Sequence, residues 1–215
     1  RSLDVELVTF NDYVLPNEAL SKGDIDVNAF QHKPYLDQQI KDRGYKLVSV
    51  GNSFVYPIAG YSKKIKSLDE LQPGSQVAIP NDPTNLGRSL LLLQQVGLIE
   101  LKEGVGLLPT SLDIIENPKN LKIVELEAPQ LPRSLDDAQI ALAVINTTYA
   151  SQIGLTPAKD GIFVEGKESP YVNLIVARED NKDAENVKKF VQAYQSDEVY
   201  EAANKIFNGG AVKGW

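Results

Sequence analysis

Short apolar runs alternate with stretches of helical periodicity along the whole chain. Runs such as Leu3–Phe10 and Gln76–Pro80 have the length and the apolar content of strands. We predict further strands at Ile25–Ala29, Tyr45–Val50, Phe54–Tyr61, Leu121–Glu127, Gln139–Ile145 and Tyr171–Ala177. Strands that alternate with helices are typical of an α/β fold with mainly parallel sheets, which is the fold class that we predict.

Proline and glycine mark where several helices begin and end. Pro16 and Gly23 flank a short helix, and Pro34 and Gly44 flank the next one. The residues from Ser67 to Glu70 fit a capping box. Longer helices are predicted at Leu86–Val96, closed by Gly97, and at Asp183–Gln195 and Asp197–Phe207, before an irregular tail at Gly209–Trp215.

The order of these elements predicts two lobes. We expect the first lobe to comprise residues 1–57 and 174–215, and the second, residues 58–173, to be inserted into it. The extended segments Phe54–Tyr61 and Tyr171–Ala177 would then form a two-strand hinge. A cleft between lobes is a favoured place for a small ligand, and hinge closure around that ligand follows.

Composition and charge exclude several classes of function. The 215-residue chain has a net charge of −7 and no basic run, which argues against nucleic acid and anionic lipid as partners. The effector domain of a transcription regulator would need a DNA-binding segment, and the sequence has no helix-turn-helix pattern. No apolar run approaches a membrane span, and no signal-peptide pattern opens the chain. We expect that it begins inside a fold, with any targeting segment removed.

Residues suited to catalysis are scarce. The chain has no cysteine, and His32 is its single histidine. None of the common nucleophile, nucleotide or zinc motifs occurs. Asp24 and Asp26 would share a strand face, where paired carboxylates can act as an acid–base pair or bind a cation, although a solvated strand edge is the simpler interpretation. We predict a binding protein without cofactor or metal, and an enzyme on a bilobal fold is the remote alternative.

Arg88 is the most informative charge in the sequence. It follows the predicted helix start near Thr84, where the helix dipole favours an anion rather than a cation. A bound carboxylate would explain its place, held by the guanidinium and by free backbone N–H groups. A solvated arginine, or one paired with a distant acid, remains the alternative.

Two asparagines interrupt or end apolar strands. Asn173 lies within Tyr171–Ala177, where its amide would bond a ligand or mark a bulge or an edge. Asn146 follows Gln139–Ile145, where helix capping is the simpler role.

Aromatic residues gather around one strand-to-helix junction, the place where α/β sheets usually bind ligands. Their rings would form the wall of an apolar or thioether pocket, or they would simply pack in the core. For the histidine, a structural role is the alternative. The group consists of Tyr13, Phe30, His32 and Tyr35.

Five segments carry a resemblance to a known family. The sequence resembles the NlpA family, the methionine-binding lipoproteins of bacterial importers, over essentially its whole length. The segments are ALSKGDIDVNAFQHKPYL (19–36), FVYPIAGYS (54–62), VAIPNDPTNLGRSLLLL (77–93), ALAVINTTYA (141–150) and SPYVNLIV (169–176).

The resemblance implies a periplasmic-binding-protein fold with methionine in the cleft, or else another amino acid or a short methionine peptide. Arg88 would then grip the ligand carboxylate, with Asn85 a further candidate beside it, and Asn146 and Asn173 would bond the amino acid group. The aromatic group would line the side-chain pocket. The implied partners are the membrane permease and the ATPase of an ATP-binding-cassette (ABC) importer.

The start of the chain departs from the family pattern. Family members begin with a lipoprotein signal and a lipidated cysteine, followed by a strand and a helix before the segment that matches Leu3. We therefore expect the first lobe to lack its first strand and helix. In the full-length protein, a lipid would anchor the chain at the periplasmic face of the inner membrane.

Overall fold

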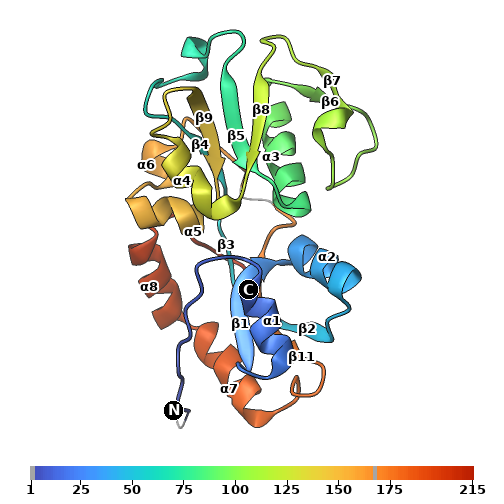
Figure 1. Cartoon of the computed structure of the whole chain (residues 1–215). Coiled ribbons are helices and arrows are strands. Elements are labelled where there is room, and N and C mark those ends of the chain that lie inside the picture. Colours follow the sequence, from blue (N-terminus) through green and yellow to red (C-terminus); the bar gives the residue numbers. More distant parts are fainter. Residues whose placement is uncertain (1–2, 167–168) are drawn as a thin grey trace. The chain divides into compact units, whose positions relative to one another are not determined.

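A computed structural model describes residues 3–166 and 169–215 (Figure 1). The chain divides into two compact units. Unit 1 consists of Arg1–Tyr56 and Lys167–Trp215, and unit 2 consists of Pro57–Gly166. Because the chain returns to unit 1 after Gly166, Asn173 lies in unit 1.

Unit 1 is built on a three-stranded sheet with the order β1-β11-β2. Its strands are β1 (Val27–His32), β11 (Asn173–Arg178) and β2 (Leu47–Asn52). The central strand pairs antiparallel with both neighbours. Its residues Leu174–Ala177 are all buried, so both faces of the sheet are covered. The prediction of mainly parallel sheets is therefore wrong for this unit, because the strand that returns from unit 2 inserts between β1 and β2.

The helices of unit 1 follow the predicted boundaries. They are α1 (Leu15–Lys22), α2 (Lys33–Arg43), α7 (Glu185–Tyr194) and α8 (Asp197–Ile206). Gly23 and Gly44 end α1 and α2 with φ angles of 85° and 68°, a conformation that glycine adopts without strain. Leu20 and Leu36 pack these two helices into one core with the central strand. The proline and glycine signals therefore identified both helices correctly.

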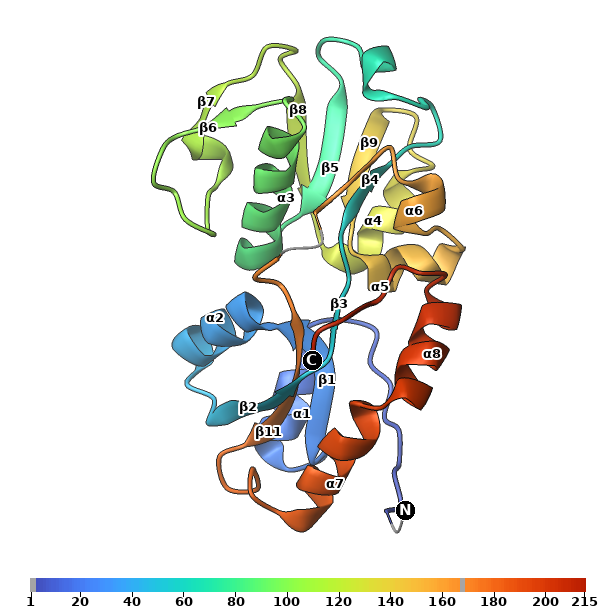
Figure 2. The ribbon, with the colours of Figure 1, turned by 180° about the vertical axis from the view of Figure 1, so that it is seen from behind.

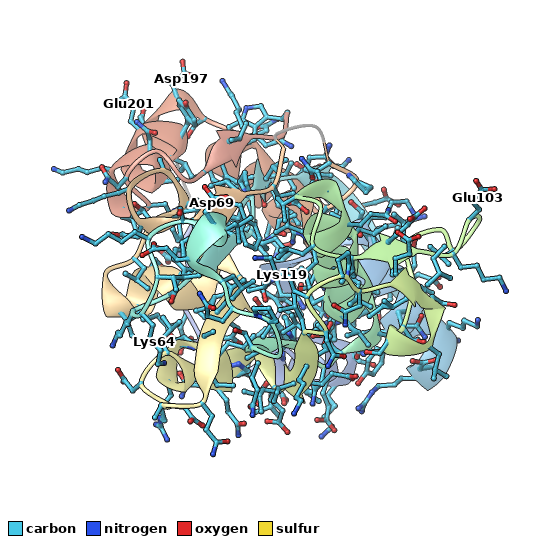
Figure 3. All side chains as sticks on the ribbon, turned by 90° about the horizontal axis from the view of Figure 1, so that it is seen from above. Lys64, Asp69, Glu103, Lys119, Asp197 and Glu201 are labelled. Carbon is cyan, nitrogen blue, oxygen red and sulfur yellow. The ribbon has the colours of Figure 1, made fainter. Side chains whose placement is uncertain are left out.

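The C-terminal tail is more ordered than predicted. Within Gly209–Trp215, β12 (Val212–Lys213) pairs antiparallel with β3 (Phe54–Val55). Trp215 packs edge-on against Phe54, at a ring distance of 5.1 Å. On α8, Asp197 and Glu201 project outward (Figure 3). The tail is thus anchored on unit 1 by backbone pairing and aromatic contacts.

Unit 2 contains a five-stranded mixed sheet with the order β10-β4-β9-β5-β8. Its strands are β10 (Phe163–Val164), β4 (Ala59–Tyr61), β9 (Ile140–Ile145), β5 (Gln76–Pro80) and β8 (Lys122–Leu126). Only the pairs of β5 with β8 and with β9 are parallel. Two views show α3 (Pro83–Gln95) on one face of this sheet and α4 (Leu131–Ser134) on the other (Figures 1 and 2).

Smaller elements complete unit 2. They are η1 (Leu68–Glu70), η2 (Ser111–Asp113), η3 (Ala128–Gln130), α5 (Thr147–Ala150), η4 (Ser151–Ile153), α6 (Pro157–Asp160) and the short pair β6 (Glu100–Leu101) and β7 (Ile114–Glu116). The predicted capping box is present at η1, where Ser67 and Glu70 bond each other's backbone. Glu103 projects from the loop after β6, away from the sheet (Figure 3).

Two predicted strand assignments are wrong. Leu3–Phe10 forms no strand, and none of the described strands pairs with it. Its apolar side chains are largely exposed, with Leu7 at 87%. Phe54–Tyr61 is not one strand but two, β3 and β4, because the chain passes into unit 2 at Pro57. Within residues 3–166 and 169–215, no helix is long and apolar enough to cross a membrane.

Candidate functional site

The first turns of α3, after Pro83, are buried inside unit 2. Asp82 is the N-cap of this helix and accepts a hydrogen bond from the backbone N–H of Asn85 at 3.2 Å. Every residue from Thr84 to Leu90 is buried. Gly87 is required by the packing, because a Cβ there would come within 2.3 Å of the Leu107 carbonyl oxygen. The first turn of α3 is thus held tightly by its surroundings.

Arg88 is buried and paired with an acid that is distant in sequence. Its Nε and Nη2 donate to the two carboxylate oxygens of Glu165, at 2.9 and 2.6 Å. The two side chains are only 4% and 11% exposed. This paired form is the alternative that the sequence left open. It also shows that the Arg88 guanidinium is presented in the fork geometry that binds a carboxylate.

Asn146 belongs to the same part of unit 2 as Asn85. It stands at the N-cap position of α5, but its side chain makes no capping hydrogen bond, so the capping interpretation is wrong. Its Nδ2 instead donates to Oδ1 of Asn85 at 3.3 Å. Its Oδ1 is buried and has no partner among the described residues. A buried acceptor of this kind is costly unless something bonds to it.

Asp82 supports the Asn85 side chain. Besides capping the helix, its carboxylate accepts from Nδ2 of Asn85 at 2.8 Å. Desolvation by the surrounding protein raises the pKa of Asp82 above its usual range, and the hydrogen bonds from Asn85 offset this shift only in part. No charged partner contributes to the shift.

The predicted aromatic group is assembled in unit 1. The rings of Tyr13, Phe30 and Tyr35 lie 5.9–6.0 Å apart, centroid to centroid. The Tyr35 hydroxyl donates to the Tyr13 backbone carbonyl, which ties the segment before α1 to α2. Tyr35 is buried, whereas Tyr13 and Phe30 are half-buried. The three rings therefore form one cluster with part of its surface accessible.

His32 has a structural role in this cluster. It is the N-cap of α2, and its Nδ1 accepts from the backbone N–H of Tyr35 at 3.1 Å. An acceptor nitrogen carries no proton, so the imidazole is neutral in this geometry. Its ring also packs edge-on against Tyr171 at 5.1 Å. The structural alternative for His32 is thus present, and it places the ring beside the other predicted residues.

Asn173 is the first residue of β11 and lies opposite His32 in the strand register. Its backbone carbonyl accepts from Ser53 N–H at 2.7 Å, and the residue is 7% exposed. The strand is central, and its register shifts lie between Asn28 and Gln31 and between Ile175 and Val176. The interpretation of Asn173 as an edge or bulge residue is therefore wrong.

The predicted residues thus form two groups, one in each unit. Unit 1 holds Tyr13, Phe30, His32, Tyr35 and Asn173, and unit 2 holds Asn85, Arg88 and Asn146. Asp24 and Asp26 join neither group. They are exposed and lie before β1 rather than in it, so they do not form the predicted strand pair. No cluster of three potential metal-binding side chains occurs in the part of the chain that the structure describes.

Comparison with known proteins identifies the family to which these groups belong. The model of the NlpA lipoprotein family matches residues 1–215. The chain belongs to the NlpA lipoprotein family. The family resemblance inferred from the five sequence segments is therefore confirmed.

Curated relatives of this NlpA lipoprotein are closely similar. The chain is 93% identical to the D-methionine-binding lipoproteins MetQ of Yersinia pestis and of Escherichia coli K12. Each alignment covers 99% of this chain and 79% of the relative. These relatives are described as binding proteins and not as enzymes.

Solved structures confirm the predicted fold class. A crystal structure of the methionine-binding protein MetQ is 93% identical, with a TM-score of 0.98 over 99% of this chain and 86% of that one. A periplasmic substrate-binding protein of an ABC transporter from Coxiella burnetii is 50% identical, with a TM-score of 0.94 over 99% and 88%. A nutrient-binding protein from Burkholderia cenocepacia, solved with bound methionine, is 54% identical, with a TM-score of 0.95 over 99% and 89%.

Three residues of this NlpA lipoprotein contact the predicted groups but were missed in the sequence. Glu165 pairs with Arg88, Asp82 bonds Asn85, and Tyr171 packs on His32. Asp82 could have been found from its N-cap position before Pro83. Glu165 had no such signal, because nothing in its own neighbourhood refers to a residue 77 positions away.

Proposed function

We propose that this chain is the substrate-binding component of an ABC-type importer and that its substrate is methionine. The relatives named for binding methionine, with 93% identity over almost the whole chain, support this assignment. The neighbour solved with methionine supports the same ligand at 54% identity. The protein would supply selective capture, and the importer would supply the energy of transport.

The buried, unpartnered Oδ1 of Asn146 is the observation that carries the site assignment. An amino acid needs an acceptor for its ammonium group and a cation for its carboxylate. In unit 2, Asn146 bonds to Asn85, and α3 carries both Asn85 and Arg88. The acceptor and the cation therefore belong to the same part of this unit. We propose that the ammonium of methionine bonds to Asn146 and that its carboxylate binds Arg88.

The pairing of Arg88 with Glu165 suggests how that carboxylate would bind. Glu165 accepts from Nε and Nη2, which are two of the donor positions of a guanidinium. Displacing Glu165 would leave its charge buried without a counterion, which is costly. We therefore propose that Glu165 stays paired with Arg88 when the ligand carboxylate binds the guanidinium.

The group in unit 1 would recognise the rest of the ligand. Sulfur interacts favourably with the edges of aromatic rings, and the ring cluster of Tyr13, Phe30 and Tyr35 offers such edges. The Asn173 amide would add a polar contact to the amino acid group. We propose that both groups take part in recognising methionine.

The partners and the location follow from the proposed importer. The permease would receive methionine from this protein, and the cytoplasmic ATPase would drive its passage. The family's description as lipoproteins supports a membrane-associated position in the periplasm. We propose that a lipid anchors the full-length protein at the periplasmic face of the inner membrane.

Calorimetry with a ligand panel tests the assignment. We expect L- or D-methionine to bind most tightly among methionine, leucine, glutamine, lysine and a methionine dipeptide, because only methionine matches both groups. Mass spectrometry of the ligand released from denatured protein gives an independent identification. Tightest binding of a branched-chain or charged amino acid would refute the substrate, and tightest binding of the dipeptide would favour the peptide alternative.

Two variants test the residues. We expect Arg88→Ala and Asn173→Ala each to weaken methionine binding at least about tenfold, the effect of losing one hydrogen bond to a charged group. The exposed pair of Lys33 and Asp37 offers a matched control, since Lys33→Ala also removes a cation. Affinity equal to wild type in either site variant would contradict its assignment.

A further inference from the structure

Three buried amide side chains join α1 to β1 in unit 1, and we call them the amide triad. Asn17, Asn28 and Gln31 are 0%, 8% and 2% exposed. Asn17 and Gln31 form a reciprocal pair, in which each Nδ2 or Nε2 donates to the other side chain's oxygen, at 2.8 and 2.7 Å. Asn28 joins this pair, because its Nδ2 donates to Asn17 Oδ1 at 3.0 Å and its Oδ1 accepts from Gln31 Nε2 at 3.1 Å.

The strand β1 contains an extra residue at the place where the triad binds it. Between Asn28 and Gln31 the register shifts, so that three steps along β1 match two steps along β11. In a regular strand, residues 28 and 30 would face one side and residue 31 the other. Here Asn28 and Gln31 both reach Asn17 on α1. Gln31, rather than Phe30, therefore shares the α1 side of the strand with Asn28.

We propose that the amide triad positions the ring cluster: it holds the extra residue of β1 in place, so that Phe30 faces the rings of Tyr13 and Tyr35. An irregularity in a strand commonly re-aims a side chain beside a binding site. The inference rests on the proposed function, in which the ring cluster recognises the thioether. It goes further by giving a specificity role to three side chains that touch no ligand themselves.

The triad also fixes the segment that carries a second ring. Asn28 Nδ2 donates to the backbone carbonyl of Pro16 at 3.1 Å, and both Pro16 and Asn17 lie in the first turn of α1. Two views show α1 beside β1 (Figures 1 and 2). Tyr13 comes directly before this helix, and its ring lies 6.0 Å from that of Phe30. Two of the three rings thus take their positions from segments that the same amides hold together.

Apolar packing alone does not account for amides at these positions. Leucine would fill a similar volume without the cost of burying polar groups. Its contacts are not directional, however, and they do not distinguish one register of the strand from the next. Hydrogen bonds between buried amides do, because a slip of one residue would turn the side chains to the other face and leave the partners unpaired. The triad therefore suits a role in which the register itself matters.

Calorimetry on one variant and one control tests the proposal. Gln31→Leu removes three of the triad's hydrogen bonds. We expect it to bind methionine about tenfold more weakly than wild type, because the ring edges no longer meet the sulfur. We also expect it to lose the preference for methionine over norleucine, in which a methylene replaces the sulfur.

Leu47→Ala is the matched control, since it opens a cavity in the same unit without touching the triad. Leu47 lies opposite Arg178, at the other end of β11 from Asn173. This control should be less stable than wild type but bind methionine within about twofold of it and keep its preference. An equal loss of preference in Leu47→Ala would overturn the proposal, because it would assign the effect to stability alone.

A measurement without ligand separates the inference from the function on which it rests. The rings of Phe30 and Tyr35 lie 5.9 Å apart and should give nuclear Overhauser effects in wild type. We expect these signals to be lost in Gln31→Leu and kept in Leu47→Ala. Unchanged signals in a folded Gln31→Leu variant would overturn the positioning role, and so would an unchanged preference for methionine.

A second variant keeps the test open if Gln31→Leu does not fold. Asn28→Ala retains the reciprocal pair but cuts the bonds to Gln31 and to the Pro16 carbonyl. It should change the ring signals and the preference in the same direction, and wild-type values of both would overturn the role of the triad. A wild-type protein that fails to bind methionine would refute the proposed function instead, while the ring signals would still test the triad.

Discussion

At the scale of single residues, the state of Arg88 depends on a partner that local sequence could not identify. The position of Arg88 near a helix start predicted a nearby anion, and the structure contains one in the carboxylate of Glu165. The need of Arg88 for an anion was thus predictable from the sequence. The identity of the acid was not, because the two residues lie 77 positions apart and meet only through the fold.

The Arg88–Glu165 pair predicts a specific pattern of stability. Both side chains are almost fully buried, so removing either one leaves a charge without its counterion. We expect Arg88→Ala and Glu165→Ala each to lower the free energy of unfolding by about 3 kcal/mol. The double variant should lose clearly less than the sum, because no unpaired charge remains in it. Urea unfolding of the four proteins measures this coupling, and purely additive losses would show that the pair is not coupled.

At the scale of elements, local signals predicted helices better than strands. Proline, glycine and capping residues lie within the helices they define, so α1, α2 and η1 were placed correctly. A strand needs a partner, and this requirement is not visible in its own residues. Leu3–Phe10 has an apolar pattern but no described partner, whereas the tail strand β12 has few apolar residues but pairs with β3. Sheet direction was mispredicted for the same reason.

The N-terminus of α3 predicts a dependence of stability on pH. Desolvation raises the pKa of Asp82 on folding. At pH values between the ordinary aspartate pKa and this raised pKa, the folded state therefore binds a proton more readily than the unfolded state. Its contribution to stability is therefore full below the ordinary aspartate pKa and is lost as the pH rises through the raised value. Asp82→Asn has no such loss. We expect the stability of the variant, relative to wild type, to rise between about pH 3 and pH 7.

Urea unfolding of both proteins across this pH range measures the effect. The difference between the two proteins cancels the titration of all the groups they share. A difference that stays constant with pH would contradict the raised pKa of Asp82. A rising difference would show that the wild-type protein keeps an ionised acid at the start of α3 at some cost in stability.

At the scale of the whole molecule, the two groups supply complementary chemistry. Unit 2 contains the guanidinium and the buried acceptor, and unit 1 contains the ring cluster and Asn173. Each group on its own matches only part of methionine: the charged end in one case, the thioether side chain in the other. The proposed function therefore requires both units, although each has its own core.

This requirement predicts how methionine stabilises the protein against heat. A ligand at one hundred times its dissociation constant stabilises the folded state by about 2.7 kcal/mol, which corresponds to roughly 5–10 °C for a chain of this size. If the units unfold in separate transitions, a ligand that needs both groups is released when the less stable unit unfolds, so methionine should raise the lower transition toward the upper one. Differential scanning calorimetry measures each transition, with the Arg88→Ala variant as a control that should lose the shift. A shift confined to the upper transition would show that the ligand depends on the more stable unit alone, and would remove the other group from the site.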